Sequence, residues 1–196
     1  MSERELEERI MLTKKQYLEI EAYMQEHFPH AILVHQKNRY FDDGNHSIKK
    51  MRNVLRVRSF RDSKEKELTY KVKGEDGDIE YNQNISYYWS YQIIKYSRLP
   101  NGQVKDELIK EGIDVNNLKM IIDLYTRRLF VKFDDHTLFL DGNIYNNIVD
   151  YNLEVESNIS KKHAKEVILK YCELFNITYK EGYKGKSTRA FMSLKK

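Results

Sequence analysis

The feature that most constrains this chain is a repeated alternation of charged and apolar residues along short segments. Leu55 and Val57 alternate with Arg56 and Arg58, and residues 67–73 repeat the pattern with lysines as the charged members. Successive residues of a strand point to opposite faces of a sheet. The period of two therefore predicts strands with one apolar face and one cationic face.

Carboxylates alternate in the same way near both ends of the chain. Glu5 and Glu7 lie on one side of residues 3–12, and Glu154 and Glu156 lie on one side of residues 150–156. Cations thus gather on the middle strands and carboxylates on the first and last strands. The simplest interpretation is an antiparallel sheet with one solvated polar face, which is the usual arrangement.

Segregation of the two signs favours a different fold, because unpaired buried charge is costly. A closed barrel would bring the charged faces together around its interior and leave the apolar faces for helices. Clustered cations then imply an anionic ligand, and clustered carboxylates imply a hard divalent metal. We therefore expect an α+β fold, a closed antiparallel eight-stranded β-barrel with a charged lumen and helices packed outside.

The remaining segments predict one domain over residues 1–196 with several helices. Thr13 and Gln16 form a capping box at the start of a helix. The segment 141–143 reads as a turn, and a basic tail follows Gly182. Helices are expected over about 13–28, 86–98, 103–111 and 160–175, and strands over about 3–12, 31–41, 53–59, 67–73, 79–85, 118–133, 137–140 and 150–156.

Composition excludes several classes of protein. Charged residues make up 33% of the chain, against about a quarter in typical domains, and aromatics make up 12%, which argues against disorder. The net charge is only +4, so a dedicated nucleic-acid binder is not expected. Cys172 is the only cysteine, and the apolar run 31–34 is too short for a membrane span. We expect a cytoplasmic protein with Cys172 as a buried filler and no membrane partner.

Eight short segments stand in order along nearly the full length of the chain. They are Glu5-Leu6-Glu7-Glu8-Arg9 (ExExK), Tyr40-Phe41-Asp42 (YFD), Leu55-Arg56-Val57-Arg58 (LRxR), Leu68-Thr69-Tyr70-Lys71 (LTLK), Thr126-Arg127-Arg128 (the arginine strand), Leu138-Phe139-Leu140-Asp141 with Tyr145 (LxLDxxxY), Asp150 to Glu156 (DYELExE) and Lys184-Gly185-Lys186 with Arg189 (KxKxxR). No single motif is specific, but together and in this order they resemble the CYTH superfamily of triphosphate tunnel metalloenzymes, and most of all its small bacterial members of the YjbK type.

The resemblance implies roles for the charged residues. Glu5, Glu7 and Arg9 would be catalytic, and Glu5, Glu7, Glu154 and Glu156 would hold Mg²⁺ or Mn²⁺. Guanidinium groups bind phosphate bidentately, whereas lysines act as point charges. The phosphate-binding set would be Arg56, Arg58, Lys71, Arg128, Lys184, Lys186 and Arg189, with Lys73 a weaker candidate. Tyr40 and Asp42 are expected to support a strand end, and the run 161–165 is expected to be a solvated helix face.

The function implied by the resemblance is metal-dependent hydrolysis of a small triphosphate: inorganic triphosphate, thiamine triphosphate or a nucleoside triphosphate. Adenylyl cyclase activity and a phosphate-binding module without turnover remain alternatives. Two departures from the family pattern bear on this choice: Arg9 replaces a lysine, and Asn152 replaces a glutamate. The physiological substrate, the metal and the oligomeric state stay open.

Overall fold

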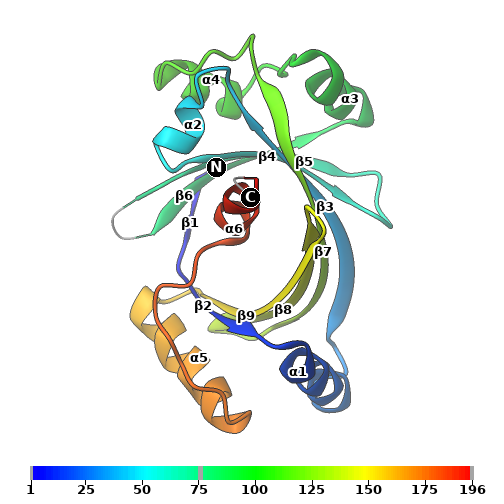
Figure 1. Cartoon of the computed structure of the whole chain (residues 1–196), viewed down its shortest axis with the longest axis vertical. Coiled ribbons are helices and arrows are strands. Elements are labelled where there is room, and N and C mark those ends of the chain that lie inside the picture. Colours follow the sequence, from blue (N-terminus) through cyan, green and yellow to red (C-terminus); the bar gives the residue numbers. More distant parts are fainter. Residues whose placement is uncertain (1, 75–76, 195–196) are drawn as a thin grey trace. The chain divides into compact units, whose positions relative to one another are not determined.

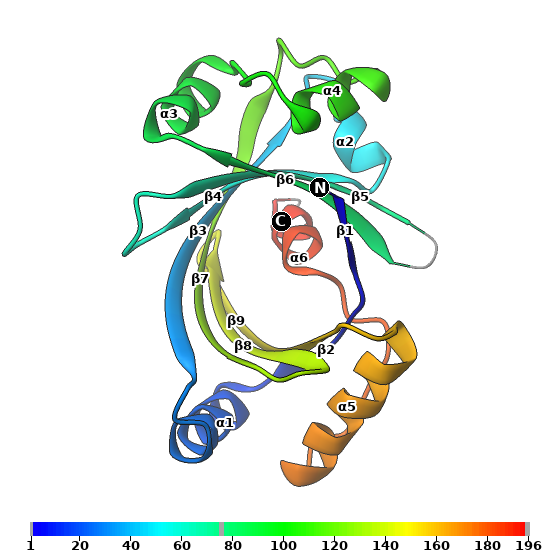
Figure 2. The same cartoon turned by 180° about the vertical axis from the view of Figure 1, so that it is seen from behind.

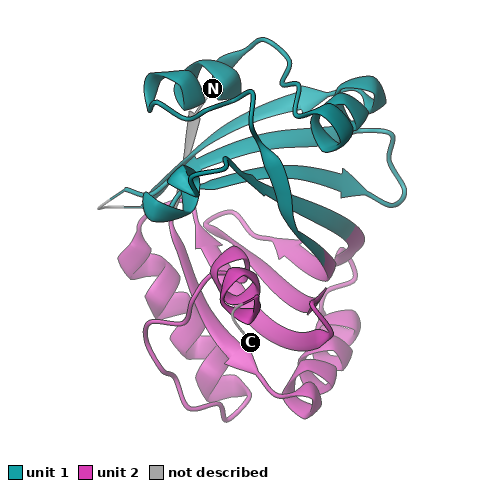
Figure 3. Cartoon of the chain, turned by 45° about the horizontal axis from the view of Figure 1, so that its top comes forward, with its two compact units in different colours: residues 1–4, 36–124 teal, residues 5–35, 125–196 magenta. Residues whose placement is uncertain are grey.

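The computed structural model describes residues 2–74 and 77–194, without the side chains of residues 2–5. The chain divides into two compact units, shown in Figure 3. Unit 1 comprises residues 1–4 and 36–124, and unit 2 comprises residues 5–35 and 125–196. That residues 1–196 form one domain stays a prediction.

Unit 1 is a layer of antiparallel strands with its helices on the apolar face (Figure 1). Its hydrogen-bonded order is β1-β6-β5-β4-β3. Leu55, Val57 and Leu68 of the strands pack with Ile93 and Leu108 of the helices in one buried cluster. The elements are β1 (Ser2–Glu5), β3 (Ile32–Asp42), α2 (Ser47–Lys50), β4 (Val54–Phe60), β5 (Lys66–Val72), β6 (Asp78–Ile85), α3 (Tyr87–Tyr96), α4 (Gln103–Lys110) and the first part of β7 (Lys119–Lys132).

Unit 2 has strand order β7-β8-β9-β2, with helices on both faces of the layer. Helices α1 and α5 cover the apolar face, and α6 lies on the opposite face (Figure 2). Ile20 and Ile168 of the helices pack with Ile10, Leu138 and Leu153 of the strands. The elements are β2 (Glu7–Leu12), α1 (Lys14–His27), the rest of β7, β8 (His136–Tyr145), β9 (Ile148–Ser157), α5 (Lys161–Leu174) and α6 (Lys186–Ser193).

The expected closed eight-stranded barrel is wrong. Among the described residues the sheet has nine strands, and its hydrogen-bonded order has two ends, β1 and β2. The segment predicted as one strand over 3–12 is interrupted at Leu6, so that β1 neighbours β6 while β2 pairs with β9. The sheet therefore ends in two edge strands and is not closed. The α+β class and the helices on the apolar faces agree with the prediction.

The segment 141–143 is not a turn, because it lies inside β8. Gly142 is paired there with Arg127 of β7 and Tyr151 of β9. The β8–β9 turn is made instead by Asn146 and Asn147, both with positive φ (45° and 62°). Two such residues are typical of a two-residue hairpin. The turn therefore lies a few residues after the segment whose composition predicts it.

Most helix boundaries follow local signals. The predicted capping box at the start of α1 is confirmed: Thr13 accepts a hydrogen bond from the Gln16 amide, and the Gln16 side chain accepts one from the Thr13 amide. The predicted basic tail contains a helix, α6, whose length of eight residues gives only a short periodic signal. None of the helices within 2–74 and 77–194 has the length and apolar composition needed to cross a membrane.

Candidate active site

The charged face of unit 2 is set by strand register. Glu7 stands opposite Glu156, and Arg9 stands opposite Glu154. Side chains directly opposite each other on antiparallel strands point to the same face. This face, on which α6 lies, includes Glu7, Arg9, Arg128, Asp141, Asn143, Asp150, Asn152, Glu154 and Glu156.

Asp141 is the centre of the face, and its side chain is fully buried. It accepts two hydrogen bonds from the guanidinium of Arg128, at 2.7 Å from Nε and 2.9 Å from Nη2. The ammonium of Lys186, the first residue of α6, lies 2.5 Å from Asp141 Oδ2. Helix α6 therefore brings a cation to a buried carboxylate of the sheet.

Glu154 joins the same cations from β9. Its carboxylate oxygens lie 3.6 Å from Nη2 of Arg128, 3.5 Å from Nζ of Lys186 and 3.7 Å from Nε of Arg9. Arg9 also forms an ion pair with Glu7. We call Arg9, Arg128, Asp141, Glu154 and Lys186 the Asp141 cluster. Three cations and two carboxylates in this cluster leave a formal excess of one positive charge.

The carboxylate of Asp141 and the guanidinium of Arg128 favour each other's charged form although both are buried. Burial acts to raise the pKa of Asp141, but Arg128 and Lys186 outweigh it and lower that pKa from 3.8 to about 2. Burial opposes the charge of Arg128 as well, yet Asp141 raises the pKa of the guanidinium above its ordinary value. For Lys186, burial and the nearby Arg128 lower the pKa of the ammonium against the pull of Asp141. Of the two cations that bind Asp141, Lys186 is therefore the one whose pKa is shifted toward the neutral form.

A second set of hydrogen bonds, one helical turn after Lys186, also holds α6 to the sheet. Arg189 donates to both oxygens of Asp150, at 2.7 and 3.0 Å, and to Oδ1 of Asn152 at 3.1 Å. The hydroxyl of Tyr145 donates to Asp150 at 2.5 Å. Burial acts to raise the pKa of Asp150, but the hydrogen bonds from Arg189 lower it overall. Asn152, where the family pattern has a glutamate, serves here as an acceptor for α6.

Unit 1 has its own charged face, on the polar side of β4, β5 and β6. Nη2 of Arg56 donates to Oε1 of Glu67 at 3.2 Å and to Oγ1 of Thr69 at 3.1 Å. Arg58 donates from Nε to Asn38 at 2.9 Å, and its Nη1 lies 3.4 Å from Oε1 of Glu67. One carboxylate of β5 thus orients two guanidinium groups of β4.

Lys71 of β5 and Lys73, which follows that strand, pair with acidic residues of β6. Nζ of Lys71 lies 3.3 Å from Asp78 and 3.9 Å from Glu80. Lys73 pairs with Asp78 at 2.7 Å but leaves 56% of its side chain exposed. Both units therefore mix the two signs on one face, and the expected segregation of cations from carboxylates onto different strands is incomplete.

Two residues of the YFD segment, Tyr40 and Asp42, are both buried but make different contacts. Asp42 is buried and accepts hydrogen bonds from the amides of Ile48 and Lys49, so it holds the short helix α2 at the end of β3. Tyr40 is buried opposite Arg56 in the β3–β4 register. The expected supporting role of Asp42 agrees with these contacts.

The structure gathers most of the predicted site residues of unit 2 but not all. Lys184 is exposed and approaches the sulfur of Met192 at 3.1 Å rather than a carboxylate. Glu5 lies in β1, and its side chain falls outside the described part of the structure. Glu156 is half-buried on the charged face, opposite Glu7. The predicted roles of all these residues stay predictions.

Sequence reasoning missed the carboxylates that position the cations. The sequence alone assigns no role to Asp141, Asp150 or Glu67. A signal exists for two of them, because Asp150 alternates in phase with Glu154, and Glu67 alternates in phase with Lys71. What the sequence lacked was the strand register, which alone shows that Asp141 stands opposite Arg128 and that Glu67 stands opposite Arg58.

The charged face of unit 2 carries carboxylate oxygens that could bind a divalent metal ion. Carboxylate oxygens are the ligands that Mg²⁺ and Mn²⁺ prefer, and Glu7, Glu154 and Glu156 provide them on one face. Within the part of the chain whose side chains are described, no three His, Cys, Asp or Glu side chains are arranged to hold a metal ion. The donor chemistry fits a hard cation, and the ion pairs that Glu7 and Glu154 make with Arg9 would have to give way.

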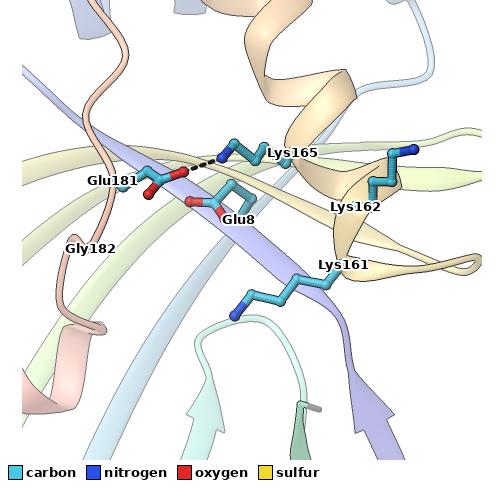
Figure 4. Close-up of a pocket in the computed structure, with 6 residues that line it drawn as sticks. All are labelled: Glu8, Lys161, Lys162, Lys165, Glu181 and Gly182. Atoms are coloured by element: carbon cyan, nitrogen blue, oxygen red, sulfur yellow. Dashed lines mark hydrogen bonds and ion pairs between the residues drawn. The ribbon is translucent and has the colours of Figure 1, made fainter. Parts of the chain in front are cut away.

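A pocket of about 420 Å³ lies elsewhere in unit 2 (Figure 4). Its lining includes Glu8, which has the opposite strand parity to Glu7 and Arg9 and therefore faces away from the charged face. Lys165 forms an ion pair with Glu181 across the pocket, while Lys161 and Lys162 are exposed. The lysines agree with the expected solvated helix face.

The chain matches the family model described as "CYTH domain" over residues 3–187. It is also similar to the protein named "Putative triphosphatase YjbK" of Bacillus subtilis (strain 168). The two are 28% identical over 177 residues, which cover 90% of this chain and 89% of that protein. The resemblance inferred from the motifs is thereby confirmed.

Two solved structures have closely similar folds. A crystal structure described as "a putative adenylate cyclase" from Bacillus halodurans has a TM-score of 0.86 and 26% identity, covering 97% of this chain and 98% of that one. A Hippeastrum protein, described as a "putative adenylyl cyclase" with a dominant triphosphatase activity, has a TM-score of 0.82 and 16% identity, covering 96% of each chain. The second likeness supports the fold alone. Because the family model spans nearly the whole sequence, this chain belongs to the CYTH domain family.

Proposed function

We propose that this protein is a divalent-metal-dependent triphosphatase acting on a small triphosphate. The observation that carries the proposal is the Asp141 cluster, in which three cations converge on one face with acidic residues that suit a hard metal. Preorganised cations stabilise charge that develops during phosphoryl transfer, and this is the main catalytic term for such reactions. Membership of the CYTH domain family and the name of the Bacillus subtilis relative support the same activity.

Each charged face, taken by itself, has cations that we propose as phosphate ligands. Arg128 and Lys186 of unit 2 are held ready by Asp141, and Arg56 and Arg58 of unit 1 are held ready by Glu67. Guanidinium groups can exchange a carboxylate partner for a phosphate of similar geometry. The remaining proposed phosphate ligands are Lys71, Arg189 and Lys184.

Glu7, Glu154 and Glu156, with Glu5, are the proposed holders of Mg²⁺ or Mn²⁺. A bound divalent ion would neutralise phosphate charge and polarise the terminal phosphorus. Glu5 or Glu7 takes a proton from the attacking water, whose oxygen forms a new bond to the terminal phosphorus. The bond from that phosphorus to the bridging oxygen breaks, and Arg9 and the other cations stabilise the negative charge left on the diphosphate.

The direct test is release of phosphate by purified protein with Mg²⁺ or Mn²⁺, using inorganic triphosphate, thiamine triphosphate and ATP. We expect hydrolysis of at least one substrate, and a loss of about a hundredfold in kcat/KM for Arg128→Gln. Arg61→Gln is the matched control, because Arg61 is an exposed arginine outside the site. No hydrolysis of any substrate with either metal would overturn the proposal.

Two alternatives are decided by the same preparation. The name of the Bacillus halodurans relative favours a test for adenylyl cyclase, in which cyclic AMP rather than phosphate forms from ATP. The replacement of a family lysine by Arg9 favours a test for binding without turnover, in which calorimetry shows tight triphosphate binding and no product forms. A cytoplasmic location belongs to the proposal as well, because Cys172, the only cysteine, is a buried free thiol that suits a reducing compartment.

A further inference from the structure

Two phenylalanines interrupt the charged face of unit 2. Phe130 of β7 stands opposite Phe139 of β8, and Phe139 stands opposite Glu154 of β9. The register therefore continues as a row across the strands, with Arg9 opposite Glu154 on β2. The rings share a face with the Asp141 cluster and lie on the side away from the hydrophobic core.

The neighbouring apolar residues of β7 and β8 lie on the opposite face from Phe130 and Phe139. Leu129, Val131, Leu138 and Leu140 lie on the other face and are buried in the core of unit 2. Phe130 and Phe139 are outside that core and are only half-buried. Aromatic surface that remains accessible on a charged face is not needed to hold the strands together, because the core residues already do so.

The two rings and a guanidinium form one stacked group. The ring centroids of Phe130 and Phe139 are 5.9 Å apart, with 36° between the planes. The guanidinium carbon of Arg128 lies 4.0 Å from the centroid of Phe139. Aromatic rings and guanidinium planes are both surfaces on which planar heterocycles stack. Arg128 also faces Asp141 and Glu154, so the stacking surface is continuous with the proposed phosphate ligands.

Inorganic triphosphate has no group that could use such a surface, whereas a substrate with a planar heterocycle has one. Resting on the proposed function, we propose that Phe130 and Phe139 form the binding surface for the aromatic ring of an organic triphosphate, such as a nucleoside triphosphate or thiamine triphosphate. The triphosphate then extends from this ring pair toward Arg128 and Lys186. The rings determine specificity and take no part in the transfer of the phosphoryl group.

The test compares kcat/KM for ATP, thiamine triphosphate and inorganic triphosphate in the wild type and in Phe130→Leu and Phe139→Leu. Leucine keeps an apolar side chain and removes the stacking surface. We expect each variant to lose about tenfold in kcat/KM for ATP, for thiamine triphosphate or for both, since stacking on an aromatic side chain is worth about 1–3 kcal/mol. Hydrolysis of inorganic triphosphate should stay within about twofold, and Phe139→Tyr should restore the preference.

Phe133→Leu is the matched control, because Phe133 follows β7 directly but packs against Phe28 and His136. It should leave the ratio between substrates unchanged. Equal losses on all three substrates in Phe139→Leu would mean that the ring only braces Arg128, and would overturn the inference. Unchanged kinetics in both variants, or a wild type that hydrolyses inorganic triphosphate alone, would overturn it as well.

Failure of the proposed triphosphatase activity can be told apart from failure of the ring-binding inference. If the wild type hydrolyses none of the three compounds, calorimetry of ATP and inorganic triphosphate binding replaces the kinetic comparison. Weaker binding of ATP by Phe139→Leu, with unchanged binding of inorganic triphosphate, supports the ring surface without catalysis. Equal dissociation constants for ATP in the wild type and both variants would overturn it.

Discussion

Arg128 and Asp141 form a bidentate ion pair, with N–O distances of 2.7 and 2.9 Å, in which the carboxylate has no exposed surface. A buried carboxylate is stable only when charged partners compensate for the lost water. Here Arg128 provides that compensation from the neighbouring strand and Lys186 provides it from α6. The pair therefore links the integrity of unit 2 to the cations proposed for phosphate binding.

Asp141→Asn should destabilise the protein by about 3 kcal/mol, because it removes the nearer of the two carboxylates that Arg128 and Lys186 share. Urea unfolding followed by circular dichroism measures the change. Asp123→Asn is the matched control: Asp123 pairs with Lys37 at 2.7 Å, but 41% of its side chain is exposed. The control should cost at most about 1 kcal/mol. Equal costs for the two variants would contradict the role of burial.

The same pair predicts a loss of stability in acid. The pKa of Asp141 is lowered in the folded protein, to about 2 from 3.8, so its stabilising contribution is complete above the unfolded value and disappears as the pH falls through the folded one. The contribution is about 2 kcal/mol. Free energies of unfolding measured at about pH 6 and about pH 2.5 should fall more steeply in the wild type than in Asp141→Asn. Parallel slopes would show that Asp141 does not titrate in this way.

Gly185 is predicted to be coupled to Arg9. A Cβ at Gly185 would lie 2.8 Å from Nη1 of Arg9, while the backbone there (φ −60°, ψ 159°) accepts alanine without strain. Gly185→Ala should therefore displace the guanidinium and lower kcat/KM for the proposed reaction by about threefold to tenfold. In an Arg9→Lys background the same substitution should have little effect, because lysine has no such nitrogen. Additive effects in this double-mutant cycle, measured on kcat/KM and on stability, would count against the coupling.

The fold was predictable where local pattern and burial agree. The capping box at Thr13 marks the start of α1, and alternation marks β4 around Arg56 and Arg58. Prediction failed where a local signal was overruled by strand pairing. Gly142 reads as a turn residue, but it lies inside β8 and is paired with a strand on each side. The break at Leu6 between β1 and β2 has no strong local signal, and these two strands are the ends of the sheet that was expected to be closed.

The sequence predicts which residues form the candidate site, but it does not predict which of them pair with each other. Arg128, Lys186, Arg9 and Glu154 were identified from alternation and from the family motifs, and the structure brings them together in unit 2. Asp141 was quoted without a role. Its role follows from register, since only the pairing of β7 with β8 places its carboxylate opposite Arg128.

Which residues of a strand share a face can be derived from the amino-acid sequence, because side-chain direction along a strand follows a period of two. The family can be derived from it as well, because several short motifs stand in a fixed order. Three properties follow from the folded chain instead: which charges neutralise each other, where the sheet has its edges, and that Phe130 and Phe139 lie beside Arg128. Those properties depend on contacts between residues distant in the chain, which strand register and the docking of α6 fix and which local pattern cannot encode.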